Sequence, residues 1–155
     1  MLDSFDIRIL EALQEDAELT QAALAERVAL SATQCARRIV RLREAGYIDK
    51  VVYHLNRAAL GLHILAHVHI SLRDHREDSN NKFHAFVLRK SEILECYAQT
   101  GTDDFLLKVV AHDLQHLSEI LDSIIKSTGG IASIHSSVVL KYVKAQHNLP
   151  LDFVR

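Results

Sequence analysis

The chain has 155 residues, which is enough for one ordinary domain or two small ones. Hydrophobic residues make up 48% and charged residues 25%, as in folded globular proteins, and no apolar run approaches the ~20 residues of a membrane-spanning helix. The first residues carry neither the basic stretch nor the apolar segment of a secretory signal. We therefore expect a cytoplasmic protein with no membrane partner.

The net charge of −2 is unevenly distributed along the chain. Residues 3–18 hold six acidic side chains against one arginine, whereas residues 27–43 hold five arginines and no acid. Because a local basic stretch acts locally, the near-neutral total does not exclude a nucleic-acid partner.

The N-terminal part of the chain predicts two helices before the basic stretch. Apolar residues recur at helical spacing within residues 3–17, and Asp3 or Ser4 is available as the N-cap. Thr20 begins a second, short helix that we expect to run through Val28, stapled by leucines on either side of its cap.

The third helix has the strongest local signals. Ser31 and Gln34 form the S-x-x-Q pattern of a capping box, and Gly46 is suited to the residue after the helix end. Residues 28–30 lead from the end of the second helix to this cap, which is the short connection of a helix-turn-helix.

One face of the third helix is predicted to bind DNA. Gln34, Arg37, Arg38 and Arg41 fall at i, i+3, i+4 and i+7, opposite an apolar stripe, and we expect no carboxylate to neutralise them before Glu44. Such a helix fits the major groove. The predicted DNA-contacting residues are Ser31, Thr33, Gln34, Arg37, Arg38 and Arg41. The alternative is an ordinary solvated helix face.

Residues 47–55 predict a β-hairpin, the wing of a winged helix. Two short apolar runs flank the polar pair Asp49-Lys50. This pair is not one that hairpin turns favour, so the signal is weak by itself.

The second half of the chain predicts a β-α-β-β-α-β order. Alternation over residues 62–72 indicates a strand, and a helix carrying Phe83 and Phe86 follows. Strands are expected at 93–100 and 104–111, then a helix from Leu114 to Ile125, and a last strand alternates from Ile134 to Tyr142. This order is the ferredoxin-like arrangement, with both helices on one face of the sheet. We expect a second copy to cover the other face, giving a two-fold dimer.

Such a fold hosts enzymes, metal carriers and ligand sensors, so function must come from particular residues. Nucleophile elbow, Walker, GxGxxG, HExxH and CxxC motifs are absent from the sequence, and we expect neither an enzyme nor a cofactor.

The ten histidines raise metal binding as an alternative, on a predicted strand face (His63, His67, His69) or at i, i+4 (His112, His116). Neither set has a cysteine or carboxylate partner at convincing spacing, so no metal site is predicted. Cys35 and Cys96 are expected to be free, buried thiols.

Motifs along nearly the whole chain resemble the Lrp/AsnC (feast/famine) regulators. The resemblance rests on Leu2-Asp3-x-x-Asp6-x-x-Ile9-Leu10-x-x-Leu13-Gln14, Leu24-Ala25-x-x-Val28-x-Leu30-Ser31-x-Thr33-x-Cys35, Arg38-Ile39-x-Arg41-Leu42-x-x-x-Gly46-Tyr47-Ile48, and the hairpin 100–109. It implies an α+β protein, with a winged helix-turn-helix domain over residues 1–60. A ferredoxin-like effector (RAM) domain for ligand sensing and oligomerisation would occupy residues 61–155.

The chain departs from the family pattern at two places. Ala29 and Gln34 replace the glycine and proline of the family's Gly-Leu-Ser-x-x-Pro-Cys run, which changes a groove-facing side chain. In the hairpin, Thr102 and Phe105 replace the first acid and the tyrosine of Gly-Asp-x-Asp-Tyr-Leu-Leu, while Asp104 keeps the second acid.

The resemblance further implies a dimer that pairs sheet to sheet and assembles further, commonly to octamers, with an amino acid bound between dimers. The matching effector-binding positions are Ala98, Gly101, Thr102, Asp104, Ser136 and Ser137. Asp104 would take the α-ammonium, projecting from the end of the sheet, and hydroxyls and backbone N–H groups would hold the carboxylate. The alternative role for Asp104 is turn chemistry.

The sequence therefore predicts a regulator of transcription that binds a double-stranded DNA operator and responds to a small molecule, an amino acid. Two alternatives stay open. One is a DNA-architectural protein without an effector, and the other is a metal-responsive regulator that uses the histidine-rich strand.

Overall fold

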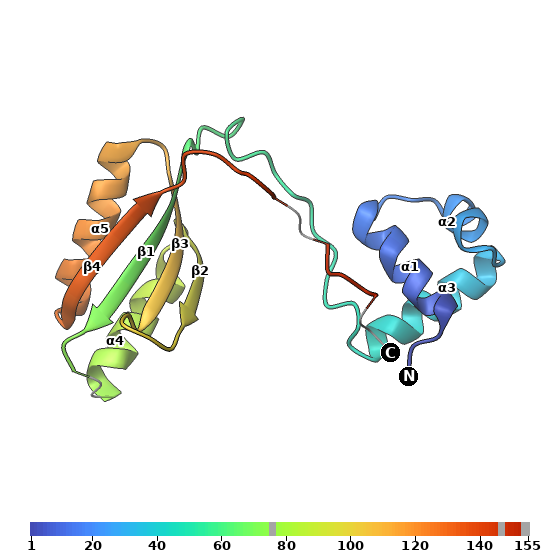
Figure 1. The fold of residues 1–155 in the computed structure, drawn as a ribbon, viewed down its shortest axis with the longest axis horizontal. Helices are drawn as coiled ribbons and strands as arrows, with labels where there is room; N and C mark the ends of the chain where they lie inside the picture. The colour runs from blue at the N-terminus through green and yellow to red at the C-terminus, as the bar shows by residue number, and fades with distance from the viewer. Residues whose placement is uncertain (75–76, 146–147, 153–155) are drawn as a thin grey trace. The chain divides into compact units, whose positions relative to one another are not determined.

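The computed structural model describes residues 1–74, 77–145 and 148–152. The chain divides into two compact units, residues 1–54 with the C-terminal segment from Lys144, and residues 55–143 (Figure 1). The C-terminal segment contacts the first unit: Leu149 hydrogen bonds to Gln14, and Leu151 packs on the helical core. The chain thus passes between the units twice.

The first unit is a bundle of three helices, α1 (Ser4–Glu15), α2 (Gln21–Val28) and α3 (Ala32–Glu44). Their apolar stripes meet in one core, whose fully buried members include Ile9, Leu24, Val28, Cys35 and Leu42. The side chains of Asp3, Thr20 and Ser31 cap the three helices as the sequence predicted. The helix-turn-helix prediction is confirmed.

The turn between α2 and α3 contains a residue in the left-handed conformation. Ala29 has φ 57° and ψ 49° and stands where the resembled family has glycine. Alanine tolerates this region at a cost of roughly 1 kcal/mol. The turn therefore keeps its geometry despite the loss of glycine.

The β-hairpin predicted for residues 47–55 is wrong for the single chain. Residues 45–63 contain no strand, and Val51, Val52, Tyr53 and Leu55 are 59–78% exposed. Asp49-Lys50 does not favour the tight turn. Ile48 of the first apolar run packs on the helical core, but the side chains of the second run stay exposed, so no packed face stabilises a two-stranded ladder there.

The second unit consists of β1 (Ile64–Leu72), α4 (Glu77–Arg89), β2 (Ile93–Ala98), β3 (Phe105–Ala111), α5 (Leu114–Thr128) and β4 (Ile131–Val138). All three strand pairs are antiparallel, in the order β2-β3-β1-β4. The ferredoxin-like prediction is confirmed. The last strand begins and ends earlier than predicted, since its pairing with β1 runs from Ile131 to Val138.

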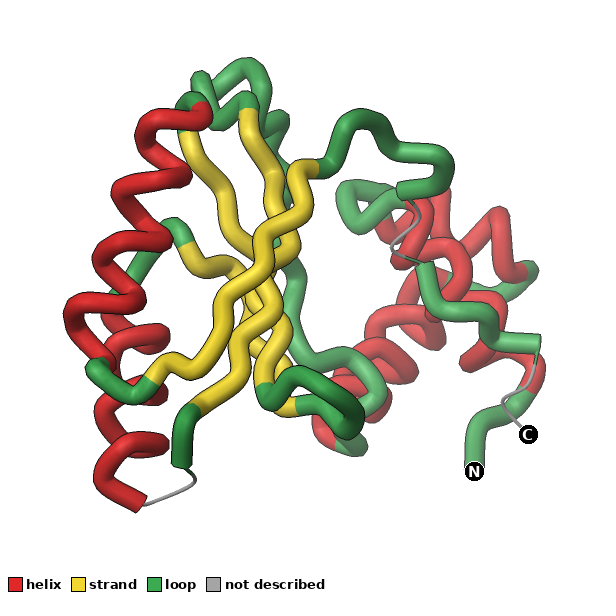
Figure 2. The backbone as a smooth tube through the Cα atoms, turned by 60° about the vertical axis from the view of Figure 1, so that its left-hand side comes forward, coloured by secondary structure: helices red, strands yellow, loops and turns green. Residues whose placement is uncertain are grey.

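Both helices of this unit cover the same face of the sheet (Figure 2). The core lies between them, where Val68, Ile70 and Leu107 meet Phe83 of α4 and Ile124 of α5. By strand alternation the opposite face carries the buried pair Leu65 and Val110 near one end and otherwise a largely polar set: His67, His69, Ser71, Glu95, Tyr97, Leu106, Lys108, Ser133, His135 and Ser137. We refer to this set of residues as the open sheet face.

The two cysteines are free thiols, as the sequence predicted, but the expected burial holds only for Cys35. Cys35 is buried and Cys96 half-buried, and burial raises the pKa of each thiol. In the described part of the chain, no helix combines the length and apolar character that crossing a bilayer requires.

Candidate functional site

The N-terminus of α3 is held by a reciprocal cap. The Ser31 hydroxyl accepts the backbone N–H of Gln34 at 3.2 Å, and the Gln34 side-chain oxygen accepts the N–H of Ser31 at 2.9 Å. The oxygen of Gln34 therefore serves the cap, and a contact from this side chain to a base edge would come from its amide nitrogen. Ser31, Thr33 and Gln34 are all exposed on the first turn.

Arg37 occupies the middle of the exposed face of α3. At 100° per residue it lies opposite the buried side chains of Cys35, Ile39 and Leu42, and it has no ion-pair partner among the described residues. Its guanidinium is therefore available to a phosphate or to guanine.

The prediction that no carboxylate neutralises the arginines before Glu44 is wrong. Asp6, fully buried on α1, accepts Arg38 Nη1 at 2.7 Å on Oδ1 and Arg41 Nη2 at 2.5 Å on Oδ2. Arg38 Nη1 also donates to Asp3 at 2.6 Å. Because the paired residues lie 32 or 35 positions apart, no spacing rule within one helix reveals the pairs.

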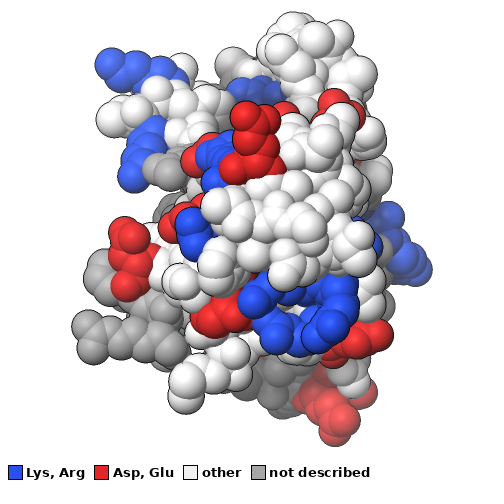
Figure 3. All heavy atoms as spheres, turned by 90° about the vertical axis from the view of Figure 1, so that its right-hand side faces the viewer, with Lys and Arg blue, Asp and Glu red and all other residues white. Residues whose placement is uncertain are grey.

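The predicted DNA-contacting arginines thus separate into two kinds: Arg37 and Arg41 reach solvent, whereas Arg38 mainly holds α1. The Arg38 side chain is 24% exposed and holds α1 against α3, while that of Arg41 is 56% exposed and both pairs with Asp6 and reaches solvent. On the surface drawn in Figure 3, basic side chains gather in a patch bordered by acidic ones. The positive field is therefore local, as the charge distribution along the sequence indicated.

Asp6 is a structurally important residue that the sequence analysis did not identify as one. A signal for it exists, because Asp6, Ile9, Leu10 and Leu13 fall at i, i+3, i+4 and i+7. An acid on a buried helical stripe requires a buried partner, since an unpaired charge is costly there.

The Asp3 carboxylate gives the first unit an acid-sensitive contact. A hydrogen bond from Arg38, followed by backbone N–H groups, lowers the pKa of Asp3 below its usual value of 3.8. A lowered folded-state pKa means that this stabilisation is present above pH ~4 and is lost as the pH falls further. Asp3→Asn keeps the cap but removes the charge. We expect the stability difference between wild type and Asp3→Asn, measured by urea unfolding, to shrink between pH 7 and pH 3. A difference independent of pH would contradict the contact.

In the second unit, the turn between β2 and β3 is tied to the end of β1. Asp104 accepts the backbone N–H of Leu72 at 2.7 Å on Oδ2, and its own N–H donates to the Ile70 carbonyl at 2.9 Å. Asp103 accepts the Ser71 hydroxyl at 3.2 Å and lies 3.5 Å from His69 Nδ1. The Asp104 carboxylate is therefore turned toward β1 and does not project beyond the end of the sheet as expected.

The predicted effector-binding residues fall into two groups within one chain. Ala98, Gly101 and Thr102 are exposed at or beyond the end of β2, and Asp104 is half-buried beside them. Ser136 and Ser137 are exposed on β4. Because β2 and β4 are opposite edges of the sheet, with two strands between them, a single chain does not bring the groups together.

The histidines that raised metal binding are dispersed. His67 and His69 lie on the open sheet face with His135, whereas His112 and His116 stack with ring centroids 5.1 Å apart. Among the described residues, no three His, Cys, Asp or Glu side chains are grouped so that they could hold a metal ion.

Two protein-family models match the chain along these two units. A winged helix-turn-helix DNA-binding model matches residues 2–49, and the Lrp/AsnC ligand-binding domain model matches residues 65–149. The chain belongs to the Lrp/AsnC family. Its members are DNA-binding regulators of transcription with a ligand-binding domain, they are oligomeric, and they are not enzymes.

Individual members of the Lrp/AsnC family are similar over nearly the whole chain. A proline dehydrogenase transcriptional activator from Rhizobium radiobacter is 36% identical, and a leucine-responsive regulatory protein from Rhizobium meliloti is 34% identical, each alignment covering 92% of both chains. A transcriptional regulator from Neisseria meningitidis, solved in complex with L-Met, is 36% identical with a TM-score of 0.93 and 98% coverage of both chains. The predicted family, fold class and regulatory function are confirmed.

Proposed function

We propose that this Lrp/AsnC regulator binds operator DNA through the exposed face of α3 and that an amino acid controls this binding. The observation that carries the DNA part is Arg37, which has no ion-pair partner among the described residues and lies at the centre of the second helix of a helix-turn-helix. Ser31, Thr33, Gln34 and Arg41 border it, while Arg38 serves mainly to hold α1.

The amino-acid part is supported by the similar regulator from Neisseria meningitidis, which was solved with L-Met. In this chain the candidate groups stand on opposite sheet edges, so we propose a site completed between subunits. Ala98, Gly101, Thr102 and Asp104 come from one chain, and Ser136 and Ser137 from another. Exposed glycine backbone and serine hydroxyls suit a carboxylate, and the Asp104 charge suits an α-ammonium.

Asp104 has two roles in this proposal, and one substitution separates them. Asparagine keeps an oxygen that can accept the Leu72 N–H but removes the negative charge. We expect Asp104→Asn to fold like wild type and to lose amino-acid binding. Asp104→Ala should also cost about 1–2 kcal/mol of stability, because it removes the hydrogen bond.

A thermal-shift screen of the twenty amino acids on the full-length protein tests the effector site. A ligand at 100 times its Kd stabilises the native state by about 2.7 kcal/mol, so the effector should raise the melting temperature clearly. Ser137→Ala should reduce this shift, and Asp104→Asn should abolish it, while the control Ser133→Ala on the same strand should not. If no amino acid shifts the melting temperature while DNA binding is intact, the proposal fails and the DNA-architectural alternative holds.

The assembly and location of the protein follow from the same proposal. The open sheet face has no helix over it within its own unit, and a second copy would cover it to give a two-fold dimer that assembles to octamers. Light scattering of the full-length protein, with and without its amino acid, measures the mass of the assembly. A DNA-binding regulator of this kind would act in the cytoplasm.

A further inference from the structure

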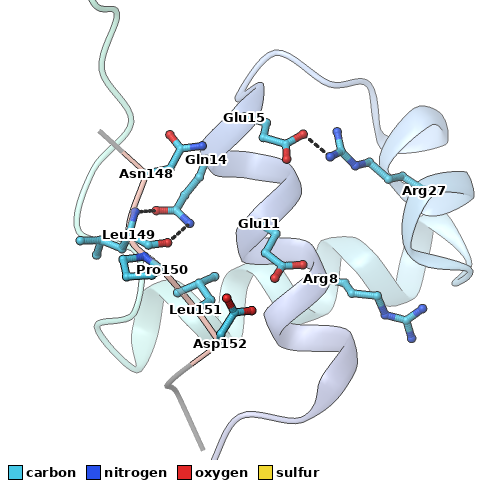
Figure 4. A pocket seen from close by; sticks show the side chains of 10 residues that line it. All are labelled: Arg8, Glu11, Gln14, Glu15, Arg27, Asn148, Leu149, Pro150, Leu151 and Asp152. Atoms are coloured by element: carbon cyan, nitrogen blue, oxygen red, sulfur yellow. Dashed lines mark hydrogen bonds and ion pairs between the residues drawn. The ribbon is translucent and has the colours of Figure 1, made fainter. Parts of the chain in front are cut away.

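The outer face of α1 holds a segment that lies 135 positions away in the sequence. The Gln14 side-chain oxygen accepts the backbone N–H of Leu149 at 2.7 Å, and its amide nitrogen donates to the Leu149 carbonyl at 3.2 Å (Figure 4). One side chain thus satisfies both main-chain groups of one residue, as a neighbouring strand would. This recognition depends on an extended backbone at position 149.

The sequence of the segment suits such docking. Pro150, the one proline of the chain, fixes its own φ near −65° and restricts Leu149 to extended conformations. Less conformational entropy is therefore lost when the segment is ordered. Leu151 then packs against the helical core of the first unit, so the contact has an apolar anchor as well as hydrogen bonds.

The docked segment forms one side of a hollow on the first unit. The remaining lining comes from α1, with Arg8, Glu11 and Glu15, and from Arg27 of α2, which forms an ion pair with Glu15. Figure 4 shows Asn148 to Asp152 running along α1 past these side chains. None of the DNA-facing residues of α3 lines this hollow, so docking leaves the proposed DNA face uncovered.

Docking of Leu149 on α1 gives the two units a second connection, which is shorter than the first. From the end of α3 to the start of β1 the chain has 20 steps, from Glu44 to Ile64, which span at most about 70 Å. From Val138 at the end of β4 to Leu149 there are 11 steps, which span at most about 40 Å. Once Leu149 is fixed on Gln14, the shorter path sets the greatest distance by which the two units can separate.

We propose that the outer face of α1 is the docking site for residues 148–152, and that the docked segment acts as a second tether that limits how far the DNA-binding unit moves from the sheet. The tether leaves the sheet from β4, the strand that carries Ser136 and Ser137. Undocking would release the first unit to the range of the longer connection.

Hydrogen exchange on the full-length protein tests the docking. The Leu149 amide should be protected well beyond an unstructured peptide, and Gln14→Ala should reduce its protection at least tenfold and lower the melting temperature of the first unit by several degrees. Gln14→Glu, which keeps the acceptor and loses the donor, should give an intermediate loss. Gln115→Ala, the same change on α5, should leave Leu149 protected. Free exchange at Leu149 in the wild type would overturn the proposal.

Distance measurements test the tether itself. Nitroxides on Glu18→Cys and Asp122→Cys, with Cys35 and Cys96 replaced by alanine, report the separation of the units in subunits diluted with unlabelled protein. Replacing residues 148–152 by glycine and serine, or Gln14 by alanine, should broaden the distance distribution toward longer values. Distributions identical to the wild type in both variants would refute the tether, because the segment would then impose no limit.

Discussion

Asp6→Ala is expected to lower the free energy of unfolding of the DNA-binding unit by about 3 kcal/mol, because it removes the buried acceptor of three hydrogen bonds, two of them from charged groups. The Asp6 carboxylate receives three donors, the N–H of Asp3 and the guanidinium groups of Arg38 and Arg41. Because Arg38 keeps Asp3 as a partner, the loss in the free energy of unfolding should lie near the lower end of the range for hydrogen bonds between charged groups.

Urea unfolding, followed by helical circular dichroism, measures the Asp6 effect. Glu11→Ala on the same helix is the matched control, since Glu11 is an exposed acid, and it should change stability by less than about 0.5 kcal/mol. Asp6→Asn should be intermediate, because an amide oxygen can still accept the Asp3 N–H. Equal effects of Asp6→Ala and Glu11→Ala would show that the buried carboxylate does not hold α1 and α3 together.

The second large effect is expected in DNA binding. The double substitution Arg37→Ala with Arg41→Ala should weaken binding roughly 100-fold in moderate salt, about 2.7 kcal/mol, because two cationic contacts are lost. The slope of log affinity against log salt should fall by roughly two, since each phosphate contact releases about one counterion. Fluorescence anisotropy, with a duplex that the protein itself selects from a random pool, gives both quantities.

Single substitutions distinguish the two kinds of arginine. Arg37→Ala should reduce affinity and the salt slope with stability unchanged, because its guanidinium has no ion-pair partner in the described part of the chain. Arg38→Ala should instead lower stability, since Asp6 and Asp3 lose their shared donor. If Arg37→Ala with Arg41→Ala binds DNA like wild type, the face of α3 is merely solvated.

The features predicted correctly from the sequence are those determined by near neighbours. The cap at Ser31 and Gln34 depends on residues three positions apart, and the strand of residues 62–72 on simple alternation. The order of elements then restricts the sheet to a handful of compact topologies, of which the ferredoxin-like one is observed. The helix-turn-helix and the ferredoxin-like unit therefore follow from local patterns and their order along the chain.

The features that the sequence did not predict depend on residues far apart. Arg38 is neutralised from α1, Asp104 turns back to Leu72 on β1, and Leu149 returns to Gln14 across 135 positions. Local patterns do not identify the partners in such pairs, because burial and register decide them; the spacing of Asp6 signals a buried acid but not which arginine it meets. The hairpin at 47–55 failed for the opposite reason, since the second apolar run of a plausible local pattern stays exposed, with no packing partner among the described residues.

Control of DNA binding by an amino acid can be measured directly. The affinity of the full-length protein for its selected duplex is measured with and without the amino acid that gives the largest thermal shift. Coupling between two sites is typically about fivefold or more, and by linkage the duplex must change the affinity for the amino acid by the same factor. We expect both changes, and both should vanish in Asp104→Asn. Identical DNA affinities with and without a bound amino acid would show that the amino acid does not control DNA binding.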